Sequence, residues 1–436
     1  MAEIRRVERK LLDLNLGSNI LIAPLHGDLP QEAQDRAIAP TQPGMRKIVL
    51  ATSIAETSLT IDGVRVVIDA GLLRVPRFDP HAGLTRLETI RVTQDSAEQR
   101  RGRAGRLEPG VCSRLWTSAE HQSLAPRRPP EMLDADLAPL LLELALWGTA
   151  NPAELSWLTP PPPGTVAQAR ELLVGLGALN PEGQITVHGK QMAELPLHPR
   201  LAHMLLKAVP LQLSNLACEL AALLSERDIL RGPSGWRNAD LRLRLDVLHG
   251  QHDHAAGATI DRAACQRVRR TADLWQRQLP RSARSDRLDS LDEAGLLLAL
   301  AYPDRIAQRQ RGNDARYLMA NGRGALFANP DPLGSEDYLV IADLDAGTQW
   351  ARIDLASPVR LRDLETLYAD QIRAVDEVSW DDTAQVVRAT RQRRLGSLIL
   401  SEQGLSKPDP LMISPSAPAS RPSPRASCCR HRAPRS

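Results

Sequence analysis

The sequence predicts an α/β protein with one parallel-sheet lobe at the N-terminus, followed by mainly helical segments and then by a small β-rich region. Three observations lead to this prediction. Apolar runs rich in Ile and Val alternate with helical patterns over residues 1–118, leucines recur at helical spacing after residue 131, and short strand candidates cluster over residues 316–378. Short, continuous apolar strands separated by helices are typical of a parallel sheet that is covered on both faces.

The N-terminal region carries three strand candidates, and a polar loop follows each of them. The runs are NILIAPLHG, RKIVLATS and VRVVIDAGL. Functional groups gather on the loops beyond the carboxyl ends of parallel strands, so we expect LHGDLP and TSIAETSLTIDG to contribute to a site. After Leu72 the alternating pattern around the turn signal at residues 79–83 predicts a long β-hairpin.

The remainder of the chain divides by pattern. Leucines at helical spacing predict a helix that ends at Trp147-Gly148, and a second helix from Val166 to Leu176 precedes the strand candidate QITVHGK. The strand candidates after residue 316 have the spacing of a small β-barrel or sandwich. The predicted domains are a parallel-sheet lobe, a winged-helix-like domain, a helical bundle, a small β-rich region and a disordered tail rich in Pro, Ser and Arg, at residues 1–118, 119–205, 206–300, 301–407 and 408–436.

Composition excludes some classes of protein and leaves others open. No apolar run approaches the ~20 residues that cross a bilayer, and the N-terminus does not resemble a secretory signal, so we expect a cytoplasmic protein without a membrane partner. The net charge is +3, but residues 411–436 hold five arginines and no acid, which leaves −2 over residues 1–410. Any basic surface must therefore be local. The five cysteines show no metal-ligand spacing. The histidines of HGQHDH could bind a metal, but we favour the interpretation of this segment as a solvated loop.

The segment QRRGRAGR, residues 99–106, places four arginines within eight residues. Asp95 as a cap, with Glu98 three residues later, predicts a helix on which Gln99, Arg103 and Arg106 share one face. An amide and two guanidiniums on one face suit the oxygens of a polyphosphate. The glycines and alanine of the segment indicate close approach of another backbone, which a solvated arginine-rich helix would not require.

A second polar segment, ATSIAETSLTIDG, follows the strand candidate KIVL. Its five hydroxyl side chains lie at a junction between strand and loop, where hydroxyls and free backbone N–H groups bind phosphates. Loops rich in Ser and Thr are also common helix caps, so this signal alone is weaker than that of QRRGRAGR.

Together the two segments, about forty residues apart, resemble motifs V and VI of the DEAH-type superfamily 2 RNA helicases. The runs IAPLHGDLP, FDPHAGLTRLETIRVTQ, PEMLDADLAPLLLELALWG and LSWLTPPPP extend the resemblance to the HrpB subgroup, from residue 1 to about residue 408. The resemblance implies a second RecA-like lobe with motifs IV to VI, ATP with Mg²⁺ as cofactors, and single-stranded RNA as partner. It also implies roles for individual residues: Gln99, Arg103 and Arg106 face the triphosphate, Asp62 and Gly102 help to hold the nucleotide, and Thr52, Thr57 and Ser58 contact the nucleic acid.

The sequence departs from an intact helicase in the first lobe. The only Gly-Lys pair is Gly189-Lys190, followed by Gln191, so no phosphate loop of the Walker type is present. The nearest match to a DEAH box is DEAG at residues 292–295, which we interpret as a solvated helix turn. We therefore expect a helicase fragment that is inactive alone, with a first lobe that a separate polypeptide could supply. The alternative is a non-enzymatic nucleic-acid-binding or regulatory protein, and we assign no metal-ligating residues.

Overall fold

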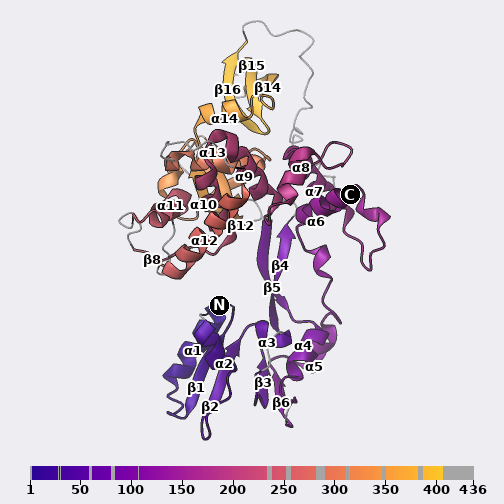
Figure 1. Ribbon diagram of the computed structural model, residues 1–436, viewed down its shortest axis with the longest axis vertical. Helices are drawn as coiled ribbons and strands as arrows, with labels where there is room; N and C mark the ends of the chain where they lie inside the picture. The colour runs from indigo at the N-terminus through magenta and orange to yellow at the C-terminus, as the bar shows by residue number, and fades with distance from the viewer. Residues whose placement is uncertain are drawn as a thin grey trace, which may run out of the picture. The chain divides into compact units, whose positions relative to one another are not determined.

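The computed structural model divides the chain into two compact units, Met1–His203 and Met204–Ser436, with the boundary inside helix α9 (Pro199–Leu211). Figure 1 shows the elements along the chain. The structure describes residues 2–27, 29, 31–57, 61–79, 84–106, 108–232, 238–251, 257–280, 290–310, 312, 315–345, 350–381 and 386–405.

The first unit begins with a parallel α/β lobe. Its parallel strands are β1 (Ile20–Leu25), β2 (Arg46–Ala51), β3 (Val66–Asp69) and β6 (Val111–Arg114). Its helices are α1 (Ala2–Asp13), α2 (Gln31–Ile38), α3 (Ile54–Thr57), α4 (Gln94–Arg101) and α5 (Ser118–Ser123). Strand β1 pairs with β2, and β3 pairs with β6, in the parallel sense that the sequence predicts.

These four strands form two separate two-stranded sheets. The pair β1–β2 has a core in which Leu25 and Ala37 are fully buried. The pair β3–β6 exposes apolar side chains instead: Val66, Ile68 and Val111 are 62%, 70% and 63% exposed. The expectation of a sheet covered on both faces is therefore wrong for β3–β6. The reason is that apolar composition predicts a strand but does not specify what packs against it.

The predicted hairpin is confirmed. Strands β4 (Leu72–Asp79) and β5 (Leu84–Arg91) pair antiparallel over their full lengths, and the turn between them lies outside the described residues. Arg77 on β4 contacts Glu88 across the hairpin at 2.9 Å and Asp134 at 3.1 Å. The pair with Asp134 holds the hairpin to the chain that follows the lobe.

The rest of the first unit is helical. Its elements are η1 (Glu131–Leu133), α6 (Ala138–Trp147), η2 (Pro152–Glu154), α7 (Pro163–Gly175), α8 (Val187–Ala193) and the start of α9. Helix α6 ends where the sequence predicts, because Gly148 adopts a φ of +102°. The strand predicted for QITVHGK is wrong: Ile185 forms one isolated bridge, and Thr186 then caps α8 by accepting a hydrogen bond from the N–H of Gly189.

The second unit combines helices with two small sheets. Its helical elements are the remainder of α9, α10 (Ser214–Ser225), α11 (Leu241–Leu248), α12 (Arg262–Gln278), η4 (Leu291–Glu293), α13 (Ala294–Ala301), η5 (Pro303–Arg305), η6 (Pro332–Ser335) and α14 (Leu361–Leu367). Its strands are β7 (Leu230–Arg231), β8 (Thr259–Ile260), β9 (Ile306–Arg309), β10 (Arg316–Met319), β11 (Gly324–Leu326), β12 (Tyr338–Asp345), β13 (Trp350–Pro358), β14 (Arg373–Asp381), β15 (Val386–Leu395) and β16 (Leu398–Gly404).

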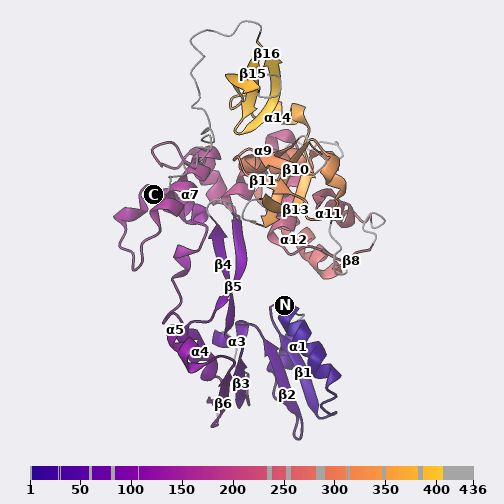
Figure 2. The same cartoon turned by 180° about the vertical axis from the view of Figure 1, so that it is seen from behind.

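The predicted β-rich region is confirmed as a closed barrel in the order β10-β11-β13-β12-β9, part of which is seen in Figure 2. Strands β14, β15 and β16 form a further three-stranded sheet. The interpretation of DEAG as solvated is wrong, because Glu293 and Gly295 are buried, and a Cβ at Gly295 would lie 1.9 Å from the carbonyl oxygen of Pro358. The glycine lets α13 pack closely on the backbone at the end of the barrel strand β13.

Two further sequence predictions concern membranes and metals. Among the helices that the structure describes, none has both the length and the apolar character needed to span a bilayer. Residues 252–254 of HGQHDH and the whole of the predicted disordered tail lie outside the described residues. His249, which is described, lies with its Nε2 2.9 Å from a carboxylate oxygen of Glu219.

Candidate functional site

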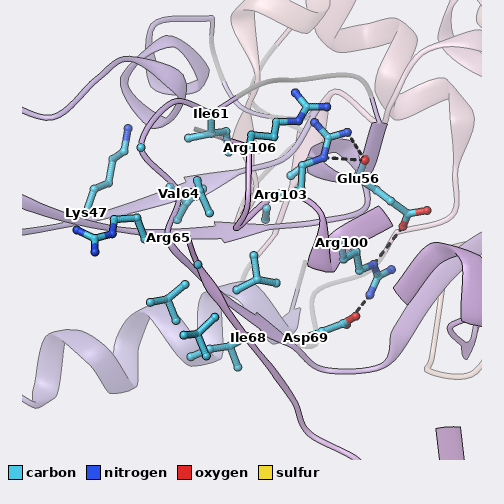
Figure 3. Close-up of a pocket in the computed structure, with 18 of the residues that line it drawn as sticks. Lys47, Glu56, Ile61, Val64, Arg65, Ile68, Asp69, Arg100, Arg103 and Arg106 are labelled. Carbon is cyan, nitrogen blue, oxygen red and sulfur yellow. Dashed lines mark hydrogen bonds and ion pairs between the residues drawn. The ribbon is translucent and has the colours of Figure 1, made fainter. Parts of the chain in front are cut away.

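A pocket of about 900 Å³ opens in the N-terminal lobe (Figure 3). Its walls come from β2, the start of α3, the loop at residues 61–65, β3 and the turn that follows α4. The strands contribute apolar side chains together with Arg46 and Lys47 of β2 and Asp69 of β3, and three arginines of the QRRGRAGR segment, Arg100, Arg103 and Arg106, also line the pocket. A pocket of this size falls within the range of about 300–1,000 Å³ that is usual for small-molecule sites.

Arg100 holds one side of this pocket together. Its Nε donates to Glu56 Oε2 at 3.1 Å and its Nη1 donates to Asp69 Oδ1 at 2.8 Å. Both carboxylates are buried, with 4% and 1% of their side chains exposed. The other terminal nitrogen donates to the carbonyl oxygen of Leu72 at 3.1 Å. Arg100 therefore compensates two buried negative charges and ties α4 to α3 and to the end of β3.

Glu56 accepts hydrogen bonds from several donors, at both its carboxylate and its backbone carbonyl. Its Oε1 accepts from the Ser96 hydroxyl at 2.7 Å and from Arg128 at 3.0 Å, in addition to the contact with Arg100. Its backbone carbonyl accepts from Arg103 Nε at 3.0 Å and from an Nη of the same guanidinium. One residue of α3 thus contacts three arginines through its two polar ends.

Arg103 and Arg106 present cationic side chains to the pocket. Partial burial lowers the pKa of the Arg103 guanidinium, and the nearby charge of Arg106 lowers it further, while Glu56 opposes this effect. The Arg103 side chain remains a cation at neutral pH because the ordinary arginine pKa is so high. Two neighbouring guanidiniums that repel each other gain from an anion between or beside them, and a phosphate is such an anion.

The helix predicted through Arg106 is shorter in the structure. Helix α4 runs from Gln94 to Arg101, and Gly102 begins a turn that contains Arg103. The predicted single helical face of Gln99, Arg103 and Arg106 is therefore wrong: the two arginines reach the pocket from the turn, and Gln99 is exposed on the helix outside the pocket lining.

The predicted capping box is wrong for a related reason. Thr93 occupies the N-cap position, and Asp95 lies inside the first turn of α4, where its Oδ1 accepts from the N–H of Ser96. Glu98 pairs with Arg101 at 2.7 Å and with Arg114 instead, and the hydrogen bond from Arg114 lowers the pKa of Glu98. The helix therefore begins two residues earlier than the sequence indicates.

Close backbone approach occurs at a different glycine from those predicted. A Cβ at Gly110 would lie 1.9 Å from the carbonyl oxygen of Ala104 and 2.7 Å from that of Arg65. At Gly102 the nearest contacts are ordinary, and at Gly105 nothing lies within 4 Å. Gly110 thus lets the chain entering β6 pass against the turn that carries the two pocket arginines.

The structure brings some of the predicted site residues together. Thr52 and Asp62 line the same pocket as Arg103 and Arg106. Thr57 is the last residue of α3, and its side chain lies outside the described part of the structure, as does the whole of Ser58. Gly102 is exposed and does not line the pocket.

Sequence reasoning missed the residues that organise this site. These are Glu56, Asp69 and Arg100. The signal was present, because Glu56 is the one acid in a run of hydroxyl and apolar side chains, and Asp69 ends an otherwise apolar strand. A carboxylate that is buried requires a cationic partner, and the arginine-rich segment supplies it.

An ATP-Mg²⁺ complex requires cations for its phosphates and oxygen ligands for its metal. Arg103 and Arg106 fit the phosphate oxygens of a nucleotide. Magnesium requires oxygen ligands in near-octahedral arrangement, and no group of three or more acidic, His or Cys side chains placed to hold a metal occurs among the described residues. The described residues therefore supply cations for the triphosphate, while the pocket carboxylates of Glu56 and Asp69 are already paired with Arg100.

Three family models match the chain in an order that defines a class of protein. The helicase conserved C-terminal domain matches residues 1–108, the winged helix of the helicase-associated HA2 domain matches residues 169–197, and the connector region of the ATP-dependent RNA helicase HrpB matches residues 371–405. The first match contains the whole arginine-bearing turn. The chain thus has the RecA-like C-terminal lobe of a helicase, followed by its accessory domains.

Individual relatives give the more specific assignment. The ATP-dependent RNA helicase HrpB of Escherichia coli K12 is 40% identical over 410 residues, which covers 94% of this chain and 47% of that protein. The pre-mRNA-splicing factor ATP-dependent RNA helicase prp22 of Schizosaccharomyces pombe is 35% identical over 257 residues, covering 59% of this chain and 22% of that protein. The chain is a homologue of the HrpB ATP-dependent RNA helicases.

Solved structures agree with this assignment. The crystal structure of the E. coli DExH-box NTPase HrpB superposes with a TM-score of 0.76 at 39% identity, covering 95% of this chain and 48% of that one. A crystal structure of the E. coli DEAH/RHA helicase HrpB gives a TM-score of 0.77 at 38% identity, with coverages of 94% and 48%. The present chain therefore spans about half the length of the HrpB relatives that it matches.

Proposed function

We propose that this chain provides the arginine-bearing and nucleic-acid-facing half of an HrpB-type ATP-dependent RNA helicase. In this proposal Arg103 and Arg106 contact the triphosphate, and Asp62 lies close to the ribose and the attacking water. Thr52, Thr57 and Ser58 contact the RNA backbone. Gln99 and Gly102 remain predicted nucleotide contacts that would require a rearrangement of the turn or a nucleotide held beyond the pocket lining.

One observation carries the proposal: two guanidiniums, Thr52 and Asp62 line one pocket, although about forty residues of sequence separate the two segments that supply most of them. A bound triphosphate would contact the arginines from one side, and the phosphate loop and metal ligands would contact it from another. In nucleotide hydrolases an arginine that stabilises the transition state raises the rate by about 10³–10⁵-fold, provided that the remaining groups are in place.

ATP hydrolysis requires two parts, this chain and a first helicase lobe. Because the sequence has no Walker-type loop, we propose that the first lobe comes from outside residues 1–436 and that ATP hydrolysis requires it. We propose the domain limits 1–118, 119–205, 206–300, 301–407 and 408–436 from the sequence pattern, the cytoplasm as location from the composition, and single-stranded RNA as partner from the family resemblance.

The test is binding of a fluorescent ATP analogue to the purified chain, together with an ATPase assay with and without RNA. Each charge-assisted hydrogen bond contributes about 1.5–3 kcal/mol, so the double variant Arg103→Ala/Arg106→Ala should bind the analogue at least tenfold more weakly. Arg101→Ala is the matched control, because Arg101 lies on the same segment but is 65% exposed and outside the pocket. ATP turnover should not exceed that of the double variant.

Three results would contradict the proposal. Equal loss of binding in Arg101→Ala would mean that general charge, and not the pocket, binds the nucleotide. Failure of the wild-type chain to bind the analogue would remove the nucleotide role. Arginine-dependent hydrolysis by the chain alone would show that it contains a complete catalytic site. If the chain binds RNA but no nucleotide, the non-enzymatic alternative replaces this proposal.

A further inference from the structure

The strands β2 and β3 each have one edge that pairs with no other strand in the part of the chain that the structure describes. Strand β2 pairs with β1 alone, and β3 pairs with β6 alone. Isolated two-stranded units are marginally stable in water, and a third strand with an apolar face usually adds the missing stability. An unpaired strand edge is also a template for pairing with another segment of polypeptide. Both free edges are therefore candidate binding surfaces.

The hydrogen bonds of β2 show which of its residues form the free edge. The N–H of Arg46 donates to the carbonyl oxygen of Asn19, next to β1, at 2.8 Å. Because backbone groups alternate between the two sides of a strand, the even-numbered residues of β2 face β1 and the odd-numbered residues face away. The odd-numbered residues Lys47, Val49 and Ala51 line the pocket, whereas the two even-numbered residues between them do not. The free edge of β2 thus borders the pocket.

The free edge of β3 borders the same pocket. The carbonyl oxygen of Asp69 accepts from the N–H of Leu115, beyond β6, at 2.9 Å, so the odd-numbered residues of β3 face β6. Val66 and Ile68 therefore direct their backbone groups away from β6, and both residues line the pocket. Their side chains are 62% and 70% exposed, although strands of parallel sheets are usually covered on both faces. Figure 3 labels one residue of each edge, Lys47 and Ile68.

We propose that an extended apolar strand of about five residues binds between β2 and β3 and pairs with both free edges. A strand presents N–H and C=O groups to its two sides in alternation, at about 3.3 Å per residue, which matches the alternation of both edges. Binding joins two two-stranded sheets into one sheet of five strands. The strand site goes beyond the proposed function, because it occupies the space between the strands and leaves Arg103 and Arg106 to the nucleotide.

The partner is a segment of polypeptide from outside residues 1–436 that carries β-branched apolar side chains. Backbone pairing with two edges requires an extended peptide, and the exposed side chains of Val66, Ile68 and Val111 favour apolar neighbours. Val111 lies on β6 and is 63% exposed, so the apolar surface continues across that pair of strands. This chain covers 47% of the E. coli HrpB relative, and the remainder of such a protein is long enough to supply a strand.

The experiment is hydrogen–deuterium exchange of the full chain, read at single residues, with and without the synthetic peptide KVIVIVK, whose lysines keep it soluble. Without the peptide, the amides of Val49 and Ile68 should exchange fast, because their N–H groups face away from β1 and β6. At a peptide concentration ten times the Kd, their exchange should slow about tenfold. The amide of Leu50, which faces β1, should change much less. Protection should therefore follow the alternation along each strand.

Two controls separate backbone pairing from apolar adhesion. The first is KVIVIVK N-methylated at alternate residues, which keeps every side chain but removes the donors along one edge, so it should give no protection. The second is Ile68→Pro, which removes an N–H that faces away from β6 and so preserves the pairing of β3 with β6. Ile68→Thr keeps this N–H and is the matched comparison. The proline variant should bind the peptide at least tenfold more weakly than the threonine variant.

Three outcomes would overturn the strand site. Equal binding of the N-methylated peptide, or equal affinities of Ile68→Pro and Ile68→Thr, would mean apolar adhesion without backbone pairing. Protection of Val49 and Ile68 without peptide, increasing with chain concentration, would mean that a second copy of this chain occupies the edges. No protection by KVIVIVK at millimolar concentration would mean that the edges do not accept a strand. The N-methylation comparison uses the wild-type chain, so it decides the question even where Ile68→Pro does not fold.

Discussion

Replacement of Arg100 by alanine should destabilise the N-terminal lobe more than any other single arginine substitution in QRRGRAGR. Arg100 is 16% exposed, and its guanidinium contacts the buried carboxylates of Glu56 and Asp69. Removing one partner of a buried ion pair typically costs about 3–5 kcal/mol, because it leaves an uncompensated buried charge.

The structure places the expected value at the lower end of this range. After the substitution Glu56 still accepts from Ser96 and Arg128, and Asp69 still accepts from the N–H of Gly71 at 3.0 Å. We therefore expect a loss of about 3 kcal/mol, which corresponds to roughly a 100-fold rise in the population of the locally open lobe.

Native-state hydrogen exchange of the amides in β3 and α4 measures this loss locally. A local measurement is required because a chain with more than one compact unit has no single free energy of unfolding. Arg101→Ala is the control: its exposed ion pair with Glu98 contributes at most about 0.5 kcal/mol. Similar losses in the two variants, or a loss below about 1 kcal/mol in Arg100→Ala, would refute the argument from buried charge.

Three further predictions follow from individual contacts. Gly110→Ala should destabilise the lobe by about 1–3 kcal/mol and weaken ATP-analogue binding, because the new Cβ would overlap the carbonyl of Ala104. Gly105→Ala should change neither, because nothing lies within 4 Å of a Cβ there. Equal effects of the two variants on amide exchange in the lobe would contradict the close approach at Gly110. Although burial opposes it, the hydrogen bond with His198 holds the pKa of Asp136 below its usual value. Asp136 therefore stabilises the fold fully above about pH 4, and this stabilisation is lost as the pH falls through the lowered pKa. Amides of α6 should exchange faster in Asp136→Asn than in the wild-type chain at pH 7, and this difference should vanish at the lower pH. RNA affinity of the chain should fall with added salt, with a slope of about −0.7 per phosphate contacted; a filter-binding titration that is independent of salt would exclude backbone contacts.

The sequence predicted element types more reliably than their packing. Strands β1, β2 and β3, the hairpin β4–β5 and the barrel strands β10 to β13 follow from runs and alternation of apolar residues, which act locally, whereas β6 and β9 were not predicted. The strand predicted in QITVHGK is wrong because Thr186 caps a helix, and a cap is a side-chain hydrogen bond that hydrophobic alternation does not reveal. The uncovered face at Ile68 depends on which elements pack there, and composition carries no such information.

The candidate site shows the same division between local and tertiary information. Arg103, Arg106, Thr52 and Asp62 were identified from motifs, and the structure places them on one pocket. The predicted helical face was wrong because α4 ends at Arg101, so spacing along an assumed helix did not describe the turn. The contacts of Glu56 with α4 join residues about forty positions apart, and no pattern within one sequence specifies such a pairing.

The four arginines of QRRGRAGR therefore have different physical roles, which follow from what surrounds each one. Arg100 neutralises buried carboxylates and so stabilises the lobe, whereas Arg101 forms an exposed pair with Glu98 that contributes little. Arg103 and Arg106 lie at the pocket, where partial burial and mutual repulsion make an anionic ligand favourable. Substituting the segment as a block would mix a folding defect with a binding defect. Single substitutions separate them, because loss of stability should follow Arg100 and loss of nucleotide affinity should follow Arg103 and Arg106.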